Sequence, residues 1–530
     1  MKLKLFNDES FMKRKRAARF KLYSKFQSFT EASQQSKAPL MASASTCLSH
    51  PNPFSNDAVF SSSRSRFQSF SCFASRSNFY GSKFTSKPIS LSTSGTRPVR
   101  PKPASSSASE PHQTFDVLII GAGIIGLTIA RQFLIGSDLS VAVIDKAVPC
   151  SGATGAGQGY IWMAHKTPSS DLWELGLRSQ KLWEELAESL IEQGLDPLEH
   201  LGWKKTGSLL VGRTPEELEV LKRTVKQQCE AGVRSEYLSA TDLRIKEPEL
   251  KVDKDTGAAF LPDDSQLDAH RAVEFLEKGN RLYSSEGRYA EFYNDPVMSL
   301  LRSGGSGEVE AIKTSRSILH CRKAIVVAAG CWSGSLMQDL IRESEIVVDV
   351  PVKPRKGHLL VLENFNSFQL NHGLMEVGYV DHQTTVQLPN MLAPSLLDQS
   401  LSVSMTATMD TVGNIVLGSS RQFAGFSTEV EETIISRIWD RAGEFFPKLR
   451  EKPLSDISKS REVRVGLRPY MPDGKPVIGP VPGLPNLFLA TGHEGNGLST
   501  SLGTAEMLAD MVLGNAEKIS SAPFAAHGRC

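Results

Sequence analysis

The stretch that decides the fold is FDVLIIGAGIIGLTIARQFLIGSDLSVAVIDK, residues Phe115–Lys146. Its apolar run over Val117–Ile120 predicts a strand buried on both faces of a parallel sheet. The glycine-rich GAGIIG follows, then an apolar-faced helix and a second strand over Val141–Ile144 that ends at Asp145. Strand, turn, helix, strand and acid in about 30 residues are typical of a dinucleotide-binding unit.

The three glycines of this turn have separate expected roles. Gly121 allows the sharp turn, Gly123 lets the helix N-terminus reach a pyrophosphate, and Gly126 allows the helix to pack closely on the strand. Asp145 can accept hydrogen bonds from a ribose diol. An ordinary tight turn would leave this acid unexplained. The predicted cofactor contacts in this unit are Gly121, Ala122, Gly123, Ile124, Ile125, Gly126, Asp145 and Lys146.

A second glycine-rich loop, CSGATGAGQGYIW at Cys150–Trp162, follows directly. A flexible, hydroxyl-bearing loop at this place suits a long cofactor that lies extended across the sheet edge. The loop therefore favours FAD over NAD. The predicted contacts in it are Ser151, Gly152, Ala156, Gly157 and Gln158.

Near the carboxyl end, ATGHEGNG (Ala490–Gly497) separates a short apolar strand from a helix with an apolar face. A tight turn needs one glycine, so three indicate that a ligand approaches the backbone at a helix N-terminus. A glycine-rich helix cap is the alternative interpretation.

These motifs together resemble the FAD-dependent amino-acid and amine oxidoreductases that include glycine oxidase, D-amino acid oxidase and sarcosine oxidase. Three further stretches carry the resemblance. They are RKAIVVAAGCWS (Arg322–Ser333), NIVLGSSRQFAGF (Asn414–Phe426) and VGLRPYMPDGKPVIGPVPGLPNLFLATGHEGNG (Val465–Gly497). The resemblance spans about Phe115 to Gly514 and is recognisable only in outline near residues 160–300.

The resemblance implies an α/β fold, in which a Rossmann-type FAD-binding domain is interleaved with an α+β substrate domain on a mostly antiparallel sheet. The FAD-binding domain is expected from residues 115–165, 266–345 and 461–515. The substrate domain is expected mainly from residues 166–265, with a helical insert, and from residues 346–460. Residues 1–110 would be a disordered targeting segment, and residues 516–530 a tail.

The resemblance also implies FAD as cofactor, held non-covalently. No counterpart of the flavin-bonded cysteine of sarcosine oxidase is visible, and Cys331, in another motif, is interpreted as a buried small residue. The positive end of the last helix would stabilise negative charge on reduced flavin. The further flavin contacts implied are Val297, Gly330, Gly492, His493, Glu494, Gly495, Asn496, Gly497 and Leu498.

Arg468, in VGLRPYMPDG, matches the arginine that grips the substrate carboxylate in glycine oxidase. Arginine suits a carboxylate because it can bond it with two N–H groups. A second arginine of glycine oxidase is replaced by Gly495 here, which leaves a pocket that is roomier or less committed to a small carboxylate. No catalytic residue is assigned. For four polar residues of neighbouring strands, solvated charge is the default expectation and a position facing the pocket is the alternative: Arg355, Lys356, His358 and Arg421.

The function favoured by the resemblance is oxidation of the CH–N bond of a small amino or imino acid by hydride transfer to flavin. Oxygen or another carrier would accept the electrons. Two alternatives stay open: a flavoprotein that acts as an assembly or electron-transfer factor, and an oxidase of a specialised amine without a carboxylate.

Charge is unevenly distributed along the chain. Residues 1–110 hold 18 basic and five acidic residues, whereas the remainder holds 42 basic and 53 acidic residues, which argues against nucleic-acid binding. From Met41 to Ser109 the chain is serine-rich with Asp57 as its one acid, a composition typical of a chloroplast or mitochondrial transit peptide. We expect the chloroplast. No apolar window is long enough for a membrane span, and the scattered cysteines argue against a metal site.

Overall fold

The computed structural model describes residues 112–302, 308–342, 346–379, 401–451, 453–457 and 460–530. The expected targeting segment, residues 1–110, lies outside these described residues. None of the helices in the described part has the length and apolar character that crossing a membrane requires.

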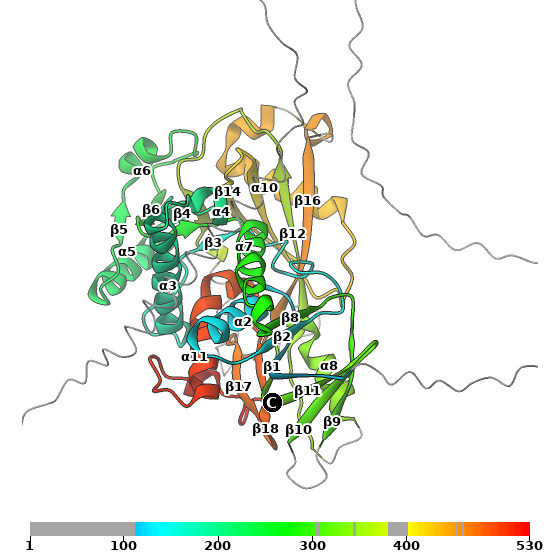
Figure 1. Ribbon diagram of the computed structural model, residues 1–530. Coiled ribbons are helices and arrows are strands. Elements are labelled where there is room, and N and C mark those ends of the chain that lie inside the picture. Colours follow the sequence, from blue (N-terminus) through cyan, green and yellow to red (C-terminus); the bar gives the residue numbers. More distant parts are fainter. Residues whose placement is uncertain (1–111, 303–307, 343–345, 380–400, 452, 458–459) are drawn as a thin grey trace, which may run out of the picture. The chain divides into compact units, whose positions relative to one another are not determined.

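The first sheet has eight strands (Figure 1). Six of them follow the order β17-β18-β11-β1-β2-β8, and a β9–β10 hairpin pairs with β11. Strands β18, β11, β1, β2 and β8 are mutually parallel, and β17 is antiparallel to β18. The strands are β1 (His112–Ile120), β2 (Val141–Ile144), β8 (Tyr289–Phe292), β9 (Val297–Arg302), β10 (Val309–Thr314), β11 (Ile318–Val327), β17 (Val477–Val481) and β18 (Leu484–Thr491).

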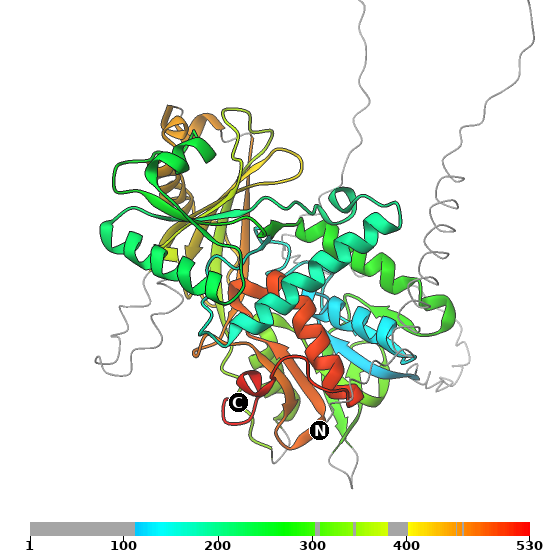
Figure 2. The same cartoon turned by 90° about the vertical axis from the view of Figure 1, so that its left-hand side faces the viewer.

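Four helices form a layer against the first sheet (Figures 1 and 2). Helix α2 packs between α7 and α11, and α3 packs on α11. The four are α2 (Ile124–Gly136), α3 (Leu172–Glu192), α7 (Ala269–Arg281) and α11 (Gly497–Leu513). The opposite face of the sheet buries a second apolar cluster that includes residues of α8 (Ser333–Ile341).

The second sheet also has eight strands, in the order β16-β12-β15-β14-β13-β4-β6-β5. Every neighbouring pair is antiparallel except β13 and β4. The strands are β4 (Ser208–Gly212), β5 (Glu236–Leu238), β6 (Gly257–Leu261), β12 (Lys353–Leu362), β13 (Gly373–Glu376), β14 (Ser402–Met409), β15 (Ile415–Arg421) and β16 (Arg461–Tyr470). Helix α10 (Glu432–Phe445) packs on this sheet against β12, β14 and β15 and buries an apolar cluster with it.

Shorter elements complete the described chain. They are β3 (Tyr160–Ile161), paired with β7 (Ser265–Gln266), the helices α4 (Pro197–Leu201), α5 (Pro215–Glu230) and α6 (Ala240–Lys246), and the 3-10 segments η1 (Ser284–Glu286), η2 (Gly330–Trp332), η5 (Pro447–Glu451), η6 (Leu454–Ile457), η7 (Glu494–Asn496) and η8 (Ala522–Phe524).

The predicted fold class is confirmed: a mostly parallel Rossmann-type sheet stands beside a mostly antiparallel sheet. Three predicted elements occur as expected. The strand over Val141–Ile144 has the predicted bounds. The first strand ends at Ile120 as predicted but begins at His112, five residues before Val117. The helix after the last glycine loop begins at Gly497.

The loop between β2 and β3 joins the two sheets through side-chain contacts. The Gln158 side-chain amide donates a hydrogen bond to the Val416 carbonyl of β15, and its oxygen accepts one from Thr406 Oγ1 of β14, both at 2.9 Å. A Cβ atom on Gly466 of β16 would lie 2.7 Å from Ala156 Cβ. The close approach of Gly466 to this loop places β16 directly against the first sheet's glycine-rich region.

Candidate cofactor and substrate site

A pocket of about 370 Å³ lies where these glycine-rich loops, the end of β1 and strand β16 meet. Its lining contains most of the residues that the sequence predicts as site residues. These are Gly121, Gly123, Ile124, Ile125, Asp145, Lys146, Ser151, Gly152, Ala156, Gly157, Gln158, Val297, Gly330, Arg468, His493, Glu494, Gly495, Gly497 and Leu498. Segments more than 340 residues apart in the chain therefore enclose one space.

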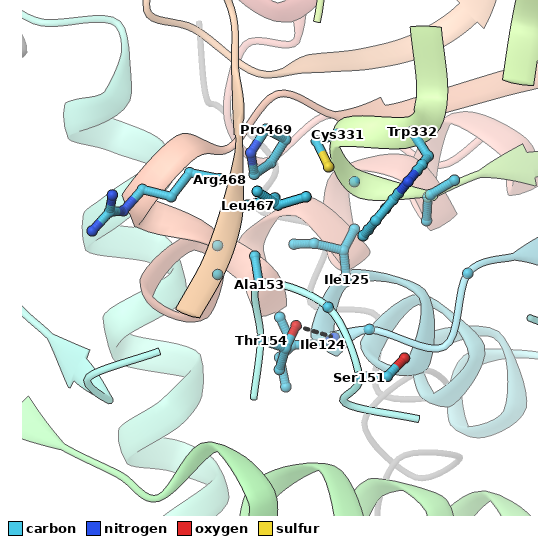
Figure 3. Close-up of a pocket in the computed structure, with 18 of the residues that line it drawn as sticks. Ile124, Ile125, Ser151, Ala153, Thr154, Cys331, Trp332, Leu467, Arg468 and Pro469 are labelled. Carbon is cyan, nitrogen blue, oxygen red and sulfur yellow. Dashed lines mark hydrogen bonds between the residues drawn. The ribbon is translucent and has the colours of Figure 1, made fainter. Parts of the chain in front are cut away.

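Four predicted site residues are not part of this lining: Ala122, Gly126, Gly492 and Asn496. Conversely, the lining contains Trp332, Leu467 and Pro469, which the sequence analysis does not assign. Figure 3 shows Leu467, Pro469 and Trp332 near the glycine-rich turn and its following loop. The role of each residue as a flavin contact stays a prediction.

The three glycines of the first turn have two different roles: Gly121 and Gly126 allow close packing, and Gly123 leaves space for a ligand. Gly121 has a φ of +121°, and a Cβ atom on it would lie 2.4 Å from the Ala328 carbonyl oxygen. A Cβ on Gly126 would lie 1.9 Å from the carbonyl oxygen of Gly121. A Cβ on Gly123 would meet only Thr154 Oγ1, at 3.3 Å. Gly121 and Gly126 therefore serve the packing of the turn, whereas Gly123 keeps the N-terminus of α2 open toward the pocket.

The N-terminus of α2 offers backbone donors to an anion. Its N-cap residue, Gly123, supplies no side-chain cap. The Ile124 N–H donates to Thr154 Oγ1 at 3.2 Å (Figure 3). Uncapped N–H groups and the helix dipole favour a phosphate at such a position.

Asp145 closes the turn from the end of β2. Its carboxylate accepts hydrogen bonds from the Ala122 N–H at 2.7 Å and from the Ala147 N–H at 2.8 Å. Each carboxylate oxygen has a further lone pair, so Asp145 can still accept a ribose hydroxyl. The open N-terminus of α2, the glycine-rich turn Gly121–Gly126 and this acid fit a dinucleotide cofactor.

The carboxyl-terminal glycine loop is fixed by the side chains of two of its three polar residues, His493 and Asn496. His493 Nε2 lies 3.0 Å from Thr504 Oγ1 of α11, and Asn496 Oδ1 lies 2.8 Å from His165 Nε2. Burial lowers the pKa of His493 to about 3, so this histidine is neutral. No side-chain hydrogen bond from Asn496 caps α11. The loop therefore presents the N-terminus of α11 next to the pocket, as the resemblance implies.

Arg468 lies on β16, at the rim of the pocket. Its Nη1 donates to the Ser420 carbonyl at 3.0 Å, and its guanidinium covers Gly357 of β12 so closely that a Cβ there would lie 2.1 Å from Nη1. Figure 3 shows the Arg468 side chain on the other side of β16 from Leu467 and Pro469. Arg468 therefore faces a different part of the site from the one that contains Trp332.

Two more arginines belong to the surroundings of Arg468. Arg355 is the register partner of Arg468 across β12 and β16, and its Nη1 lies 3.4 Å from Glu494 Oε1. Burial would raise the pKa of Glu494, but the guanidinium groups of Arg468, Arg355 and Arg421 hold it below its ordinary value. We call Arg355, Arg421, Arg468 and Glu494 the arginine cluster.

Aromatic rings support the arginine cluster. The Arg421 guanidinium lies 3.8 Å from the centre of the Tyr379 ring, and that of Arg355 lies 5.1 Å from the centre of the Tyr470 ring. The hydroxyls of Tyr160 and Tyr379 are 2.9 Å apart. Burial, and then the proximity of Tyr379, raises the pKa of Tyr160, so its hydroxyl stays protonated. Tyr379 lies outside the motifs of the sequence analysis, and Tyr160 lies in the second glycine-rich loop but is not assigned there.

The default expectation of solvated charge is wrong for Arg355, Lys356, His358 and Arg421. The side chain of Arg355 is 12% exposed, and the other three residues are buried. Lys356 and His358 lie on the face of β12 opposite to that of Arg355. Lys356 Nζ donates to the Glu431 carboxylate at 2.8 Å, and His358 Nδ1 lies 2.9 Å from Ser420 Oγ. The strand's pleat therefore separates them from the arginine cluster.

Cys331 is buried in the lining, as expected, and burial raises the pKa of its thiol to about 12. Among the described residues no group of histidine, cysteine, aspartate or glutamate could hold a metal ion. The groups available to bind a ligand in the described site are therefore the N-termini of α2 and α11, the glycine-rich loops and the arginines.

Comparison with known proteins agrees with this geometry. Residues 116–511 match the family described as FAD dependent oxidoreductase. Glycine oxidase of Pseudomonas aeruginosa is 27% identical over 431 residues, which cover 78% of this chain and 99% of that protein. D-amino acid dehydrogenase of Vibrio atlanticus is 26% identical over 464 residues, with the same coverage.

Solved structures share the fold. The structure of glycine oxidase from Geobacillus kaustophilus superimposes with a TM-score of 0.64 at 22% identity, over 79% of this chain and 100% of that chain. The family match covers most of the described residues, including both glycine-rich regions and Arg468. The chain thus belongs to the FAD-dependent oxidoreductase family and is an oxidoreductase with FAD as its non-covalent cofactor.

Proposed function

We propose that this enzyme oxidises the CH–N bond of a small amino or imino acid. The observation that carries the proposal is the position of Arg468 at the rim of the pocket. Its one hydrogen bond among the described residues goes to a main-chain carbonyl, and it forms no ion pair with a described carboxylate. A substrate carboxylate would supply the missing anion, and a guanidinium bonds a carboxylate with well-defined orientation.

Bound FAD supplies a two-electron acceptor that can take a hydride from the carbon next to nitrogen. The chain's own residues position the substrate and exclude water. Tyr160 stays protonated, and burial followed by the nearby Lys166 lowers the pKa of His165 to about 3, so both are neutral near the pocket. The N-terminus of α11 favours negative charge next to it.

The named relatives support this reaction class. The names of the similar proteins, glycine oxidase and D-amino acid dehydrogenase, describe oxidation of amino acids. At 27% and 26% identity they support the class of substrate, and the choice within that class depends on this chain's own side chains.

The test uses the full chain with FAD bound, in the absence of oxygen. We expect amino or imino acids to bleach the oxidised-flavin absorbance, and amines without a carboxylate to bleach it poorly. Arg468→Ala should retain the flavin but raise KM for the carboxylate substrate by about 100-fold or more, and Arg468→Lys should recover part of the loss. An unchanged KM in Arg468→Ala would contradict the assigned role.

We further propose that the protein acts in the chloroplast, with the mitochondrion as the alternative. The serine-rich, acid-poor composition of residues 41–109 supports this proposal. A fluorescent protein fused after residue 114 should accumulate in plastids, and diffuse cytosolic fluorescence would contradict the proposal.

A further inference from the structure

The arginine cluster contains more positive than negative charge. Arg355 Nη1 lies 3.4 Å from the Glu494 carboxylate, and Arg468 is the register partner of Arg355. The charge of Arg421 also acts on Glu494. All three lower the pKa of Glu494, so they lie close enough to act on the same charge. The cluster thus carries a net charge of about +2 in a largely buried place, which is unfavourable unless an anion binds.

Arg421 is the least compensated member of the cluster. The residue is 1% exposed, and its Nε atom has no hydrogen-bond partner among the residues that the structure describes. Its other two nitrogens make only long contacts, 3.4 Å to Ser404 Oγ and 3.5 Å to the Tyr379 carbonyl. In the described part of the chain no carboxylate forms an ion pair with it. The Tyr379 ring at 3.8 Å supports the charge without neutralising it.

Two arginines elsewhere in the protein show the contrast, whereas Arg131 is, like Arg421, buried with a guanidinium nitrogen that has no hydrogen-bond partner among the described residues. Arg178 bonds the Glu506 carboxylate with two nitrogens, at 2.6 and 2.8 Å, and Arg441 pairs with Glu376. Each of these two partly buried arginines forms an ion pair with a carboxylate of the protein itself. In the arginine cluster, Glu494 is the one carboxylate from the described residues beside three guanidinium groups, and it forms an ion pair with Arg355.

A ligand with two anionic groups matches this excess. If one carboxylate binds Arg468, as the proposed function requires, Arg421 and Arg355 still lack an equal number of negative charges. We propose that the substrate is an amino or imino dicarboxylic acid, whose second carboxylate is held by Arg421 with Arg355. The inference rests on the proposed function for the reaction, and on the charge of the cluster for the ligand.

The reaction stays balanced with such a substrate. In its neutral-amine form the substrate carries two negative charges, which equals the excess positive charge of the cluster. One C–H bond breaks and its electron pair goes with the hydrogen to FAD, while a C=N bond forms and the nitrogen releases one proton to water. Both carboxylates remain on the product.

Ligand binding tests the inference without turnover. The FAD-loaded full chain is titrated with malonate and succinate, and separately with acetate and propionate, by the shift of the flavin absorbance spectrum and of the melting temperature. We expect the better dicarboxylate to bind about 100-fold more tightly than either monocarboxylate. Equal affinities for mono- and dicarboxylates would overturn the inference.

Substitution of Arg421 tests which residue selects the second carboxylate. Arg421→Met keeps side-chain length and removes the charge, and it should weaken dicarboxylate binding by about 100-fold and monocarboxylate binding by less than about 3-fold. Lys356→Met is the matched control, because Lys356 is a buried cation on β12 with its own partner, Glu431. The control should preserve the dicarboxylate preference.

Arg355→Met provides a second variant if Arg421→Met does not fold, and it should also reduce the preference. A preference that survives in every folded variant of Arg421 and Arg355 would overturn the assignment of these residues. Loss of the preference in the Lys356→Met control to the same degree would do so as well.

Flavin bleaching separates this inference from the proposed function. Aspartate, glutamate and iminodiacetate are compared with glycine, alanine, sarcosine and proline, using both enantiomers of chiral acids. Tight succinate binding without bleaching by any acid would contradict the proposed function and support the dicarboxylate site. Bleaching that is equally efficient with monocarboxylic acids, without tight succinate binding, would support the proposed function and overturn the inference.

Discussion

Two walls of the same pocket are built in different ways. The nucleotide wall consists of the lining residues between Ile120 and Gly159, a short continuous part of the chain. The opposite wall comes from β12, β15, β16 and η7, which are spread over residues 353–496. Of the arginine cluster, Arg468 and Glu494 belong to the lining, and Arg355 and Arg421 lie behind it on the same strands. In the nucleotide wall glycines are needed because backbone atoms approach closely, whereas in the arginine cluster the determining property is charge.

The two regions are therefore limited by different physical properties, steric fit in the first and side-chain charge in the second. In the turn that supports the nucleotide wall, steric fit is strict: a single added carbon at Gly126, behind the lining, would meet a carbonyl oxygen at 1.9 Å. In the arginine cluster, the β-sheet supplies a scaffold on which side chains can change without moving the backbone. We therefore expect substitutions in the nucleotide wall to affect folding and flavin content, and substitutions in the arginine cluster to affect ligand choice.

The largest effect that this comparison predicts is that of Gly126→Ala. The added Cβ would collide with the Gly121 carbonyl oxygen, and neither backbone segment can move without disturbing the turn. We expect little or no flavin-bound protein, measured as the ratio of flavin to protein absorbance after purification.

Gly136→Ala is the matched control in the same helix. A Cβ on Gly136 would have no atom within 4 Å, so flavin content should be unchanged. Normal flavin content in Gly126→Ala would contradict the strict packing of the turn behind the nucleotide wall.

A second effect concerns acid sensitivity at the junction of the walls. Burial lowers the pKa of His493 to about 3, and burial with Lys166 lowers that of His165 to about 3, from an ordinary value of 6.5. Between these values the unfolded chain binds protons that the folded chain does not. The free energy of unfolding should therefore fall as pH decreases from 6.5 toward 3, by roughly 4 kcal/mol per histidine.

Melting temperatures across this pH range check the prediction. His493→Gln cannot take up this proton, so its melting temperature should depend less steeply on pH than that of the unmodified protein. His200→Gln, at a partly exposed position of α4, should leave the dependence unchanged. An equal pH dependence in the protein and in His493→Gln would contradict the role of the buried ring.

The smallest effect concerns the link between the two sheets. Gln158→Leu removes hydrogen bonds to Val416 and Thr406 and should lower the free energy of unfolding by roughly 1–3 kcal/mol. Urea denaturation followed by flavin fluorescence measures this loss. Gln227→Leu, on the exposed surface of α5, is the control and should change stability little. Equal stability of Gln158→Leu and the unmodified protein would mean that this link does not hold the sheets together.

Much of the nucleotide wall could be predicted from sequence because its constraints are local. The glycines, strand ends and Asp145 lie within about 30 residues and each has a steric or hydrogen-bonding reason. Asn496 belongs to a motif of the same kind and its role as a flavin contact stays a prediction, but the sequence does not indicate that its side chain bonds His165. Local spacing cannot show a partner that lies 331 residues away.

The arginine cluster was harder to predict for the same reason. Arg421 and Tyr379 become neighbours only through the pairing of β13, β14 and β15, and no spacing in the sequence marks that contact. Arg468 could be identified because it lies in a recognisable motif. Arg355 becomes its neighbour through the register of β12 and β16. Strand register decides which charges meet, and single-sequence patterns do not determine it.

The position of β18 and α11 has a consequence for the synthesis of the protein. The first sheet places β1 beside β11 and β11 beside β18, so its central strands come from both ends of the described chain. Domains usually fold in order as they leave the ribosome. Here the nascent chain exposes the apolar edge of β11 until β18 has been synthesised, and the pocket cannot form before α11 follows it. Chaperone protection during that interval is the expected requirement.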